Sequence, residues 1–299
     1  MRTLLLPLDH TAAEATLAYA NKLAVRWPAE VVVLYCHPDA EATPATLHAE
    51  EQRLRSLVER LRYQQLTRQD GRRIRYRYRV LAGCLHDHIR AEATACAADM
   101  VVMGLEHLDD TRPEAPGNHA AAITELVSYP VLVVPPGRRS LPTRLAFCAD
   151  FPALMPDVLP RLKALEAAFP VPLDLVQFYA PAERSRRQYL KKAVDRAAAH
   201  LGWNFSATHL LEEDAPLEGT GDFCARAQAQ LLVIAPGSTA ELLRYFDGCY
   251  TATRAYHTRI PLLVLRPAER RPAVACCARC AERLAQTSAA YSGFEVSEK

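Results

Sequence analysis

The loop from Met103 to Ala120 carries the residue types with which an α/β protein can hold a phosphate. It follows a short apolar run and precedes a helix-like stretch, and it has a glycine near each end, at positions 104 and 117. Such glycines let backbone N–H groups approach an anion, and the N-terminus of the next helix adds a favourable field. The same loop contains two histidines, four carboxylates and two prolines, which are poor neighbours for a polyphosphate. The sequence therefore predicts a ligand loop of unusual chemistry.

Other polar residues follow directly after the predicted strands. Pro7, Leu8, Asp9 and His10 end the first strand, and Cys36 and His37 end the second. In an open parallel sheet, ligands bind beyond the carboxyl ends of the strands, where the strand order reverses. Asp9 could accept hydrogen bonds from a ribose or an adenine amine, or it could cap the next helix. The Cys and His residues, with His107, could instead bind a soft divalent metal, although no spacing here is diagnostic.

The chain repeats one pattern of strands and helices. Residues 3–9 and 144–150 are both short apolar stretches that end in Asp, and helical patterns follow at 12–27 and 156–169. Later, residues 99–130 align with 230–261 without a gap, so that Met103 pairs with Ile234. A shared register of this length indicates an internal duplication.

This order of elements predicts the fold. Strands that are apolar throughout, alternating with helices, are typical of a parallel sheet with helices on both faces. We therefore predict an α/β fold with two doubly wound, Rossmann-like, five-stranded parallel-sheet domains in tandem. The predicted domains are residues 1–138 and 141–268, joined by a short Pro/Gly/Arg linker and followed by a Cys-containing tail, partly disordered, at 269–299.

These features resemble the universal stress protein family in its tandem form, with two such domains in one chain. The resemblance rests on LLLPLD, EVVVLY, ADMVVMG and SYPVLVVP, which occupy the places of strands 1, 2, 4 and 5. It implies a protein of the stress response whose fifth strands, at 130–135 and 261–267, pair antiparallel about a pseudo-twofold axis. The chain would then be its own dimer, and pairing with a second copy stays open.

Nucleotide-binding members of that family carry Gly-x2-Gly-x9-Gly-Ser/Thr after the fourth strand. At this spacing the first half has Gly104, His107, Gly117 and Asn118, and the second half has Ala235, Ser238, Gly248 and Cys249. The histidine adds a Cβ but can contact a phosphate when protonated, and Asn can still donate a hydrogen bond. The resemblance implies an ATP site in the first half, formed by Pro7, Leu8, Asp9, Cys36, Met103, Gly104, His107, Gly117, Asn118 and His119, and a degenerate second copy.

Composition narrows the remaining classes of function. The chain has 36 basic and 34 acidic residues, so the charge balance does not favour a nucleic-acid partner. No apolar run is long enough to span a membrane, and scattered cysteines argue against a disulfide framework, so we expect a cytoplasmic protein. The alternating RRIRYRYRV stretch places arginines on one face, as expected of an edge strand, although an anion surface stays open.

No catalytic motif emerges, so we expect a non-enzyme, with a weak ATPase as the less favoured reading. Two alternatives to nucleotide binding remain. One is an interaction or signalling module with a vestigial pocket, whose protein partner the sequence does not name. The other is a thiol- or metal-responsive protein acting through Cys276, Cys277 and Cys280, although we expect no metal site overall.

Overall fold

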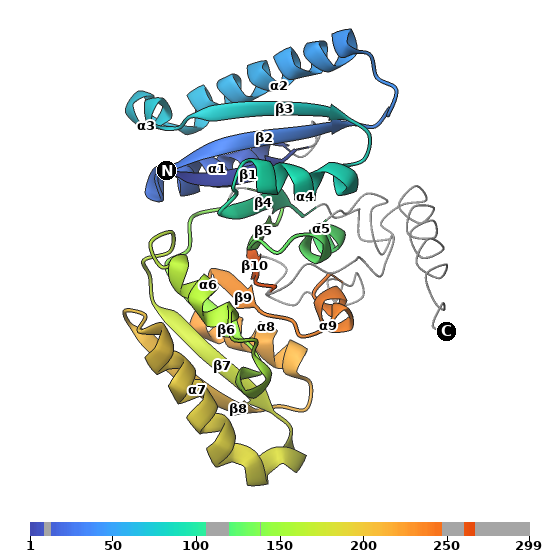
Figure 1. Cartoon of the computed structure of the whole chain (residues 1–299). Coiled ribbons are helices and arrows are strands. Elements are labelled where there is room, and N and C mark those ends of the chain that lie inside the picture. The colour runs from blue at the N-terminus through green and yellow to red at the C-terminus, as the bar shows by residue number, and fades with distance from the viewer. Residues whose placement is uncertain (9–12, 106–119, 138, 247–259, 267–299) are drawn as a thin grey trace, which may run out of the picture.

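The computed structural model describes residues 1–8, 13–105, 120–137, 139–246 and 260–266. Its strands form one ten-stranded sheet in the order β3-β2-β1-β4-β5-β10-β9-β6-β7-β8 (Figure 1). The strands are β1 (Arg2–Pro7), β2 (Ala29–His37), β3 (Tyr76–Ala82), β4 (Met100–Gly104), β5 (Val131–Val134), β6 (Leu145–Cys148), β7 (Leu173–Tyr179), β8 (Ser206–Glu212), β9 (Leu231–Ile234) and β10 (Leu262–Val264). We call β1–β5 with their helices the first half and β6–β10 with theirs the second half.

Each half is a parallel five-stranded sheet, and the two halves meet at an antiparallel pair. Leu132 of β5 lies opposite Leu263 of β10, and every residue of these two strands is buried. This arrangement confirms the predicted fold class and the antiparallel pairing of the fifth strands. The gap-free alignment is confirmed too, because Val101 pairs with Val131 in one half and Leu232 with Leu262 in the other.

Helices cover both faces of the sheet. One face carries α1 (Ala13–Arg26), α2 (Pro44–Gln65), α6 (Val158–Ala164) and α7 (Arg187–Leu201). The other face, which we call the α4 face, carries α4 (Leu85–Ala95), α5 (Ala120–Leu126), α8 (Pro216–Ala227) and α9 (Thr239–Arg244). Short helices α3 (Arg68–Arg73), η1 (Phe151–Ala153) and η2 (Pro181–Arg186) complete the described elements. Successive strand residues alternate between the two faces, and both faces are apolar, as strands buried on both sides require.

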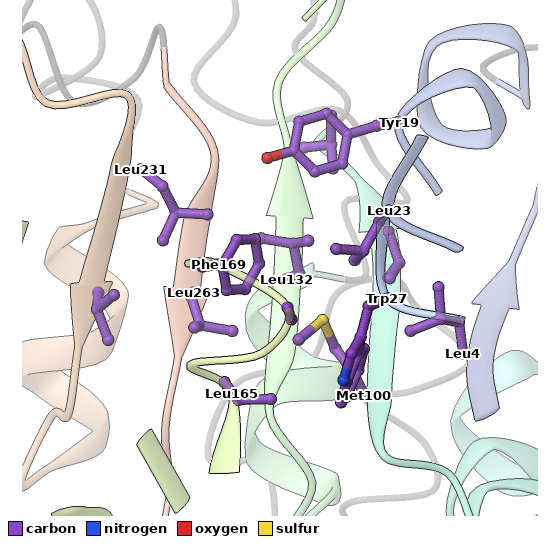
Figure 2. Close-up of a cluster of buried hydrophobic side chains, with 14 of the residues drawn as sticks. Leu4, Tyr19, Leu23, Trp27, Met100, Leu132, Leu165, Phe169, Leu231 and Leu263 are labelled. Atoms are coloured by element: carbon purple, nitrogen blue, oxygen red, sulfur yellow. The ribbon is translucent and has the colours of Figure 1, made fainter. Parts of the chain in front are cut away.

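On each face of the sheet, a hydrophobic core continues across the junction between the halves. Figure 2 shows Trp27 and Leu132 of the first half near Phe169 and Leu263 of the second half, all buried. The linker is held to α1, because the ammonium of Lys22 donates to the carbonyl of Arg139 at 2.8 Å. On the α4 face, a buried ion pair joins Glu125 to Arg266 across the junction at 3.4 Å. The two halves are therefore packed as one body along this seam.

Two local predictions can be checked directly. The helix predicted at 156–169 is shorter, since α6 ends at Ala164 and the next residues form turns with N–H groups bonded mainly three residues back. The arginines of β3 do lie on its exposed face at the sheet edge, where Arg77 pairs with Glu30 and Arg79 with Glu92. These ion pairs weaken the case for a free anion surface. Among the described residues, no helix has the length and apolarity needed to cross a membrane.

Candidate functional site

The strand order of the first half reverses between β1 and β4, so the carboxyl ends of these strands frame the predicted site. Pro7 is the last residue of β1, and Leu8 continues the ladder by donating its N–H to the carbonyl of Leu34 at 2.9 Å. Met103 and Gly104 end the neighbouring β4. The topology thus brings these four predicted residues to one edge of the sheet, where an open α/β sheet binds ligands.

Gly104 lies where helix α1 approaches the end of β4 closely. A Cβ on this residue would lie 2.7 Å from Oγ1 of Thr16, a buried side chain on α1. That distance is too short for an unstrained contact, so the position favours glycine for steric reasons. The glycine at the start of the predicted loop therefore has a packing role that holds with or without a ligand.

Several predicted site residues lie outside the described residues. These are Asp9, His107, Gly117, Asn118 and His119, together with the tail cysteines Cys276, Cys277 and Cys280. Their part in the site stays a prediction. Cys36 is described, and it lies near the end of β2, at the same edge as Pro7 and Gly104.

The second half contains a cavity of about 390 Å³ at the corresponding edge. It opens where β6 and β7 end, and helices α8 and α9 contribute to its wall. Its lining includes apolar side chains such as Leu190 and Leu217 as well as charged ones. This size and mixture are typical of a site for a small molecule.

The ladder register identifies the equivalent positions in the two halves. Leu4 pairs with Met100 in the first half as Leu145 pairs with Leu231 in the second. On the other side, Leu4 pairs with Val31 as Leu145 pairs with Leu173. Counting along the strands from these partners, four cavity-lining residues correspond to predicted site residues: Cys148 to Pro7, Ala149 to Leu8, Asp150 to Asp9 and Phe178 to Cys36. The counterparts of these four first-half positions thus line a cavity in the second half.

The second-half cavity has an internal acceptor where a phosphate would need donors. Glu241 accepts the backbone N–H of Gly237 at 2.9 Å, and Ser238 caps α9 by accepting the N–H of Glu241 at 3.1 Å. The side chains of Asp150 and Arg244 line the cavity and form no ion pair with another described residue. Glu183 and Arg186 also line the cavity and pair with each other. The described lining thus has three carboxylates and two guanidinium groups. This wall is poorly suited to a triphosphate.

The described residues do not form a metal site. No group of three or more His, Cys, Asp or Glu side chains in the described ranges could hold an ion. Burial, aided by Cys84 and Glu92, raises the pKa of the Cys36 thiol to about 12, which opposes its binding a metal as a thiolate. His37 is engaged locally, because the N–H of Asp39 donates to its Nδ1 at 3.2 Å.

One contact was not anticipated from the sequence. Sγ of Cys84, the residue that precedes α4, lies 3.1 Å from Nδ1 of His86. His88, two residues further along α4, points elsewhere, since its Nε2 lies 2.9 Å from the carbonyl of Ala82. The spacing of a Cys two residues before a His is the trace of this pair in the sequence.

Comparisons with known proteins agree with this architecture. Residues 1–135 match the profile of the universal stress protein family. The structure is similar to that of a universal stress protein from Archaeoglobus fulgidus, with a TM-score of 0.62 at 12% identity, over 91% of this chain and 97% of that one. It is also similar to a functionally unknown protein from Pseudomonas aeruginosa, with a TM-score of 0.56 at 14% identity, over 96% and 98% of the chains. No protein with a curated description matches the chain.

Proposed function

Because the chain belongs to the universal stress protein family, in its tandem form, we propose that it is a stress-response protein that binds an adenine nucleotide, ATP, in its first half. The observation that carries this proposal is the second-half cavity of about 390 Å³, whose wall contains the counterparts of Pro7, Leu8, Asp9 and Cys36. Since the two halves share strand order and register, the same edge of the first half is the natural place for a ligand.

The proposed roles follow from the chemistry of each position. Asp9 accepts hydrogen bonds from the ribose or the adenine amine, as a carboxylate at a strand end can do. Gly104 and Gly117 let backbone N–H groups approach the phosphates, and the amide of Asn118 donates to them. His107 adds a cation to this loop when it is protonated.

The first half is favoured over the second for a polyphosphate. In the second half, the carboxylate of Glu241 already accepts the N–H of Gly237, and Ala235 stands in the place of Gly104. A phosphate there would have to displace an internal anion and approach further carboxylates. We therefore propose one nucleotide for each chain, with the fold serving as a binding module rather than as an enzyme.

Calorimetric titration of the full chain with Mg-ATP tests this proposal. We expect about one equivalent to bind, and Asp9→Ala to weaken binding at least about tenfold, the loss of one charge-assisted hydrogen bond. Asp150→Ala, at the matching position of the second half, is the control and should leave the affinity unchanged. With ATP at about 100 times its Kd, the free energy of unfolding should rise by about 2.7 kcal/mol.

Other outcomes identify the alternatives. If millimolar Mg-ATP gives no heat of binding and no thermal stabilisation, the nucleotide proposal is rejected and the interaction module remains. Steady ATP turnover that disappears in Asp9→Ala would favour a weak ATPase.

A further inference from the structure

The contact between Cys84 and His86 gives the first half a thiol with a base beside it. We propose that Cys84 is a peroxide-reactive thiol activated by His86, and that Cys36 is its disulfide partner. The site lies at the strand edge that carries the proposed nucleotide pocket, but its chemistry needs no nucleotide.

The geometry of Cys84 suits a nucleophile. Its Sγ lies 3.1 Å from Nδ1 of His86, within hydrogen-bond reach for a sulfur atom. The thiol does not cap the helix, because no hydrogen bond joins it to a backbone N–H of the first turn of α4. Both side chains are only half-buried, so a small oxidant can reach them. A neighbouring imidazole can take the thiol proton and leave the thiolate, which is the reactive form.

Cys36 lies on the face of the sheet that α4 covers. In the ladder between β2 and β3 it pairs with Leu81, and its side chain packs in the same hydrophobic cluster as Leu81 and Leu85. The turn that leads into α4 is fastened to this end of β2, because Gly83 donates its N–H to the carbonyl of His37 at 2.8 Å. With a φ of +108°, Gly83 supplies the left-handed backbone conformation that this turn into α4 uses.

Two further observations support Cys36 as the partner of Cys84. Cys84 is among the groups that raise the pKa of Cys36, after the larger effect of burial, which agrees with this placement. In the second half, Phe178 occupies the position of Cys36, and its Cε1 atom lies 2.8 Å from where a Cβ on Gly219 of α8 would be. A side chain at this position therefore points at the first turns of the covering helix.

The proposed reaction is a two-electron oxidation by a hydroperoxide. The Cys84 thiolate attacks one peroxide oxygen, an S–O bond forms, the O–O bond breaks, and the leaving hydroxide takes the proton held by His86. The Cys36 thiol then attacks the sulfenic sulfur, an S–S bond forms, and water leaves with the Cys36 proton. With hydrogen peroxide, two thiols are oxidised and one peroxide is reduced to two waters.

The other described cysteines are poor competitors. Cys148 and Cys224 are buried, and burial raises the pKa of both thiols. Cys96 is half-buried like Cys84, but its Sγ lies 3.7 Å from the carbonyl of Ala93, and burial raises its pKa. Cys96 is exposed to a similar degree as Cys84, but no described histidine contacts its sulfur. It is therefore the matched internal control.

Mass spectrometry of the full chain tests the proposal. The reduced protein is treated with hydrogen peroxide, free thiols are alkylated, and each cysteine-containing peptide is quantified, so that tail cysteines are scored separately. We expect a disulfide between Cys36 and Cys84, formed faster than any oxidation of Cys96. Cys36→Ser should leave a sulfenic acid on Cys84 that dimedone traps, and His86→Asn should slow oxidation of Cys84 by about tenfold or more.

Cys96→Ser should leave the reaction unchanged, and circular dichroism checks that each variant is folded. If Cys84 is oxidised no faster than Cys96, or if no disulfide to Cys36 forms, the proposal is wrong. Neither result bears on ATP, since the assay contains none.

Discussion

Replacing Gly104 by alanine tests how the first-half strand end is built. The new Cβ would lie 2.7 Å from Oγ1 of Thr16, closer than side-chain atoms normally pack. Thr16 is 3% exposed and β-branched, so it has little freedom to move aside within α1. Overpacking of a tight interior typically costs about 1–3 kcal/mol. We therefore expect Gly104→Ala to lower the free energy of unfolding by about 1–3 kcal/mol, measured by urea denaturation of the full chain.

Two further variants separate this steric effect from others. Gly237→Ala is the control, because the one contact its Cβ would make with the described residues is with Oε2 of Glu241, at an ordinary 3.8 Å. Thr16→Ala removes the clashing atom. The double variant Gly104→Ala/Thr16→Ala should therefore lose less free energy of unfolding than the sum of the two single variants, by more than about 0.5 kcal/mol. If Gly104→Ala costs no more than Gly237→Ala, or if Thr16→Ala brings no recovery, the steric reasoning is refuted.

Two more predictions concern the packing of Leu263 between the halves and the ion pair of Asp174 in the second half. Leu263→Ala should lower the free energy of unfolding by about 2–5 kcal/mol in urea denaturation, because Leu263 is fully buried in the central strand pair, whereas Tyr63→Ala, at a site 81% exposed, should change it by less than about 0.5 kcal/mol. Burial raises the pKa of Asp174, but hydrogen bonds from Arg144 and His209 have the larger effect, so the net pKa is lowered. The ionised Asp174 therefore stabilises the fold fully above the unfolded pKa of about 4. This stabilisation is lost as the pH falls through the lower pKa of the folded state. Asp174→Asn should therefore be destabilising at pH 7, and urea denaturation at pH 3 should show a smaller difference from the wild type; an equal difference at both pH values would contradict this.

The fold was largely accessible from the sequence. Strands such as Val31–Leu34 are apolar throughout, and the repeat keeps one register, so the two parallel sheets follow from pattern alone. The antiparallel seam between them was implied by the resemblance to the universal stress protein family. The helix predicted at 156–169 was too long. Periodicity continues past Ala164, but the backbone there changes to tight turns before Pro170 and Pro172. Apolar spacing does not distinguish a helix from successive turns with a similar repeat.

The site was accessible only in part. Strand ends could be placed, because parallel strands present their carboxyl ends at the same edge. The steric need for glycine at Gly104 depends on the approach of α1, which no local pattern encodes. The contact of Cys84 with His86 depends on the cap geometry of α4, and that of Glu241 with Gly237 depends on how the loop before α9 folds back. Such contacts are set by tertiary geometry rather than by residue spacing.

The second half carries an internal acceptor at the strand edge that corresponds to the proposed nucleotide site. In the second half, Glu241 accepts the N–H of Gly237 from inside the protein, as a bound phosphate oxygen would from outside. The carboxylate of Glu241 and a phosphate oxygen would compete for the N–H of Gly237. The carboxylate has the advantage, because it is held on the adjoining helix α9. The cavity beside it nevertheless stays open, at about 390 Å³. Because the donor of Gly237 is occupied and Ala235 stands in the place of Gly104, the proposed nucleotide site is confined to the first half.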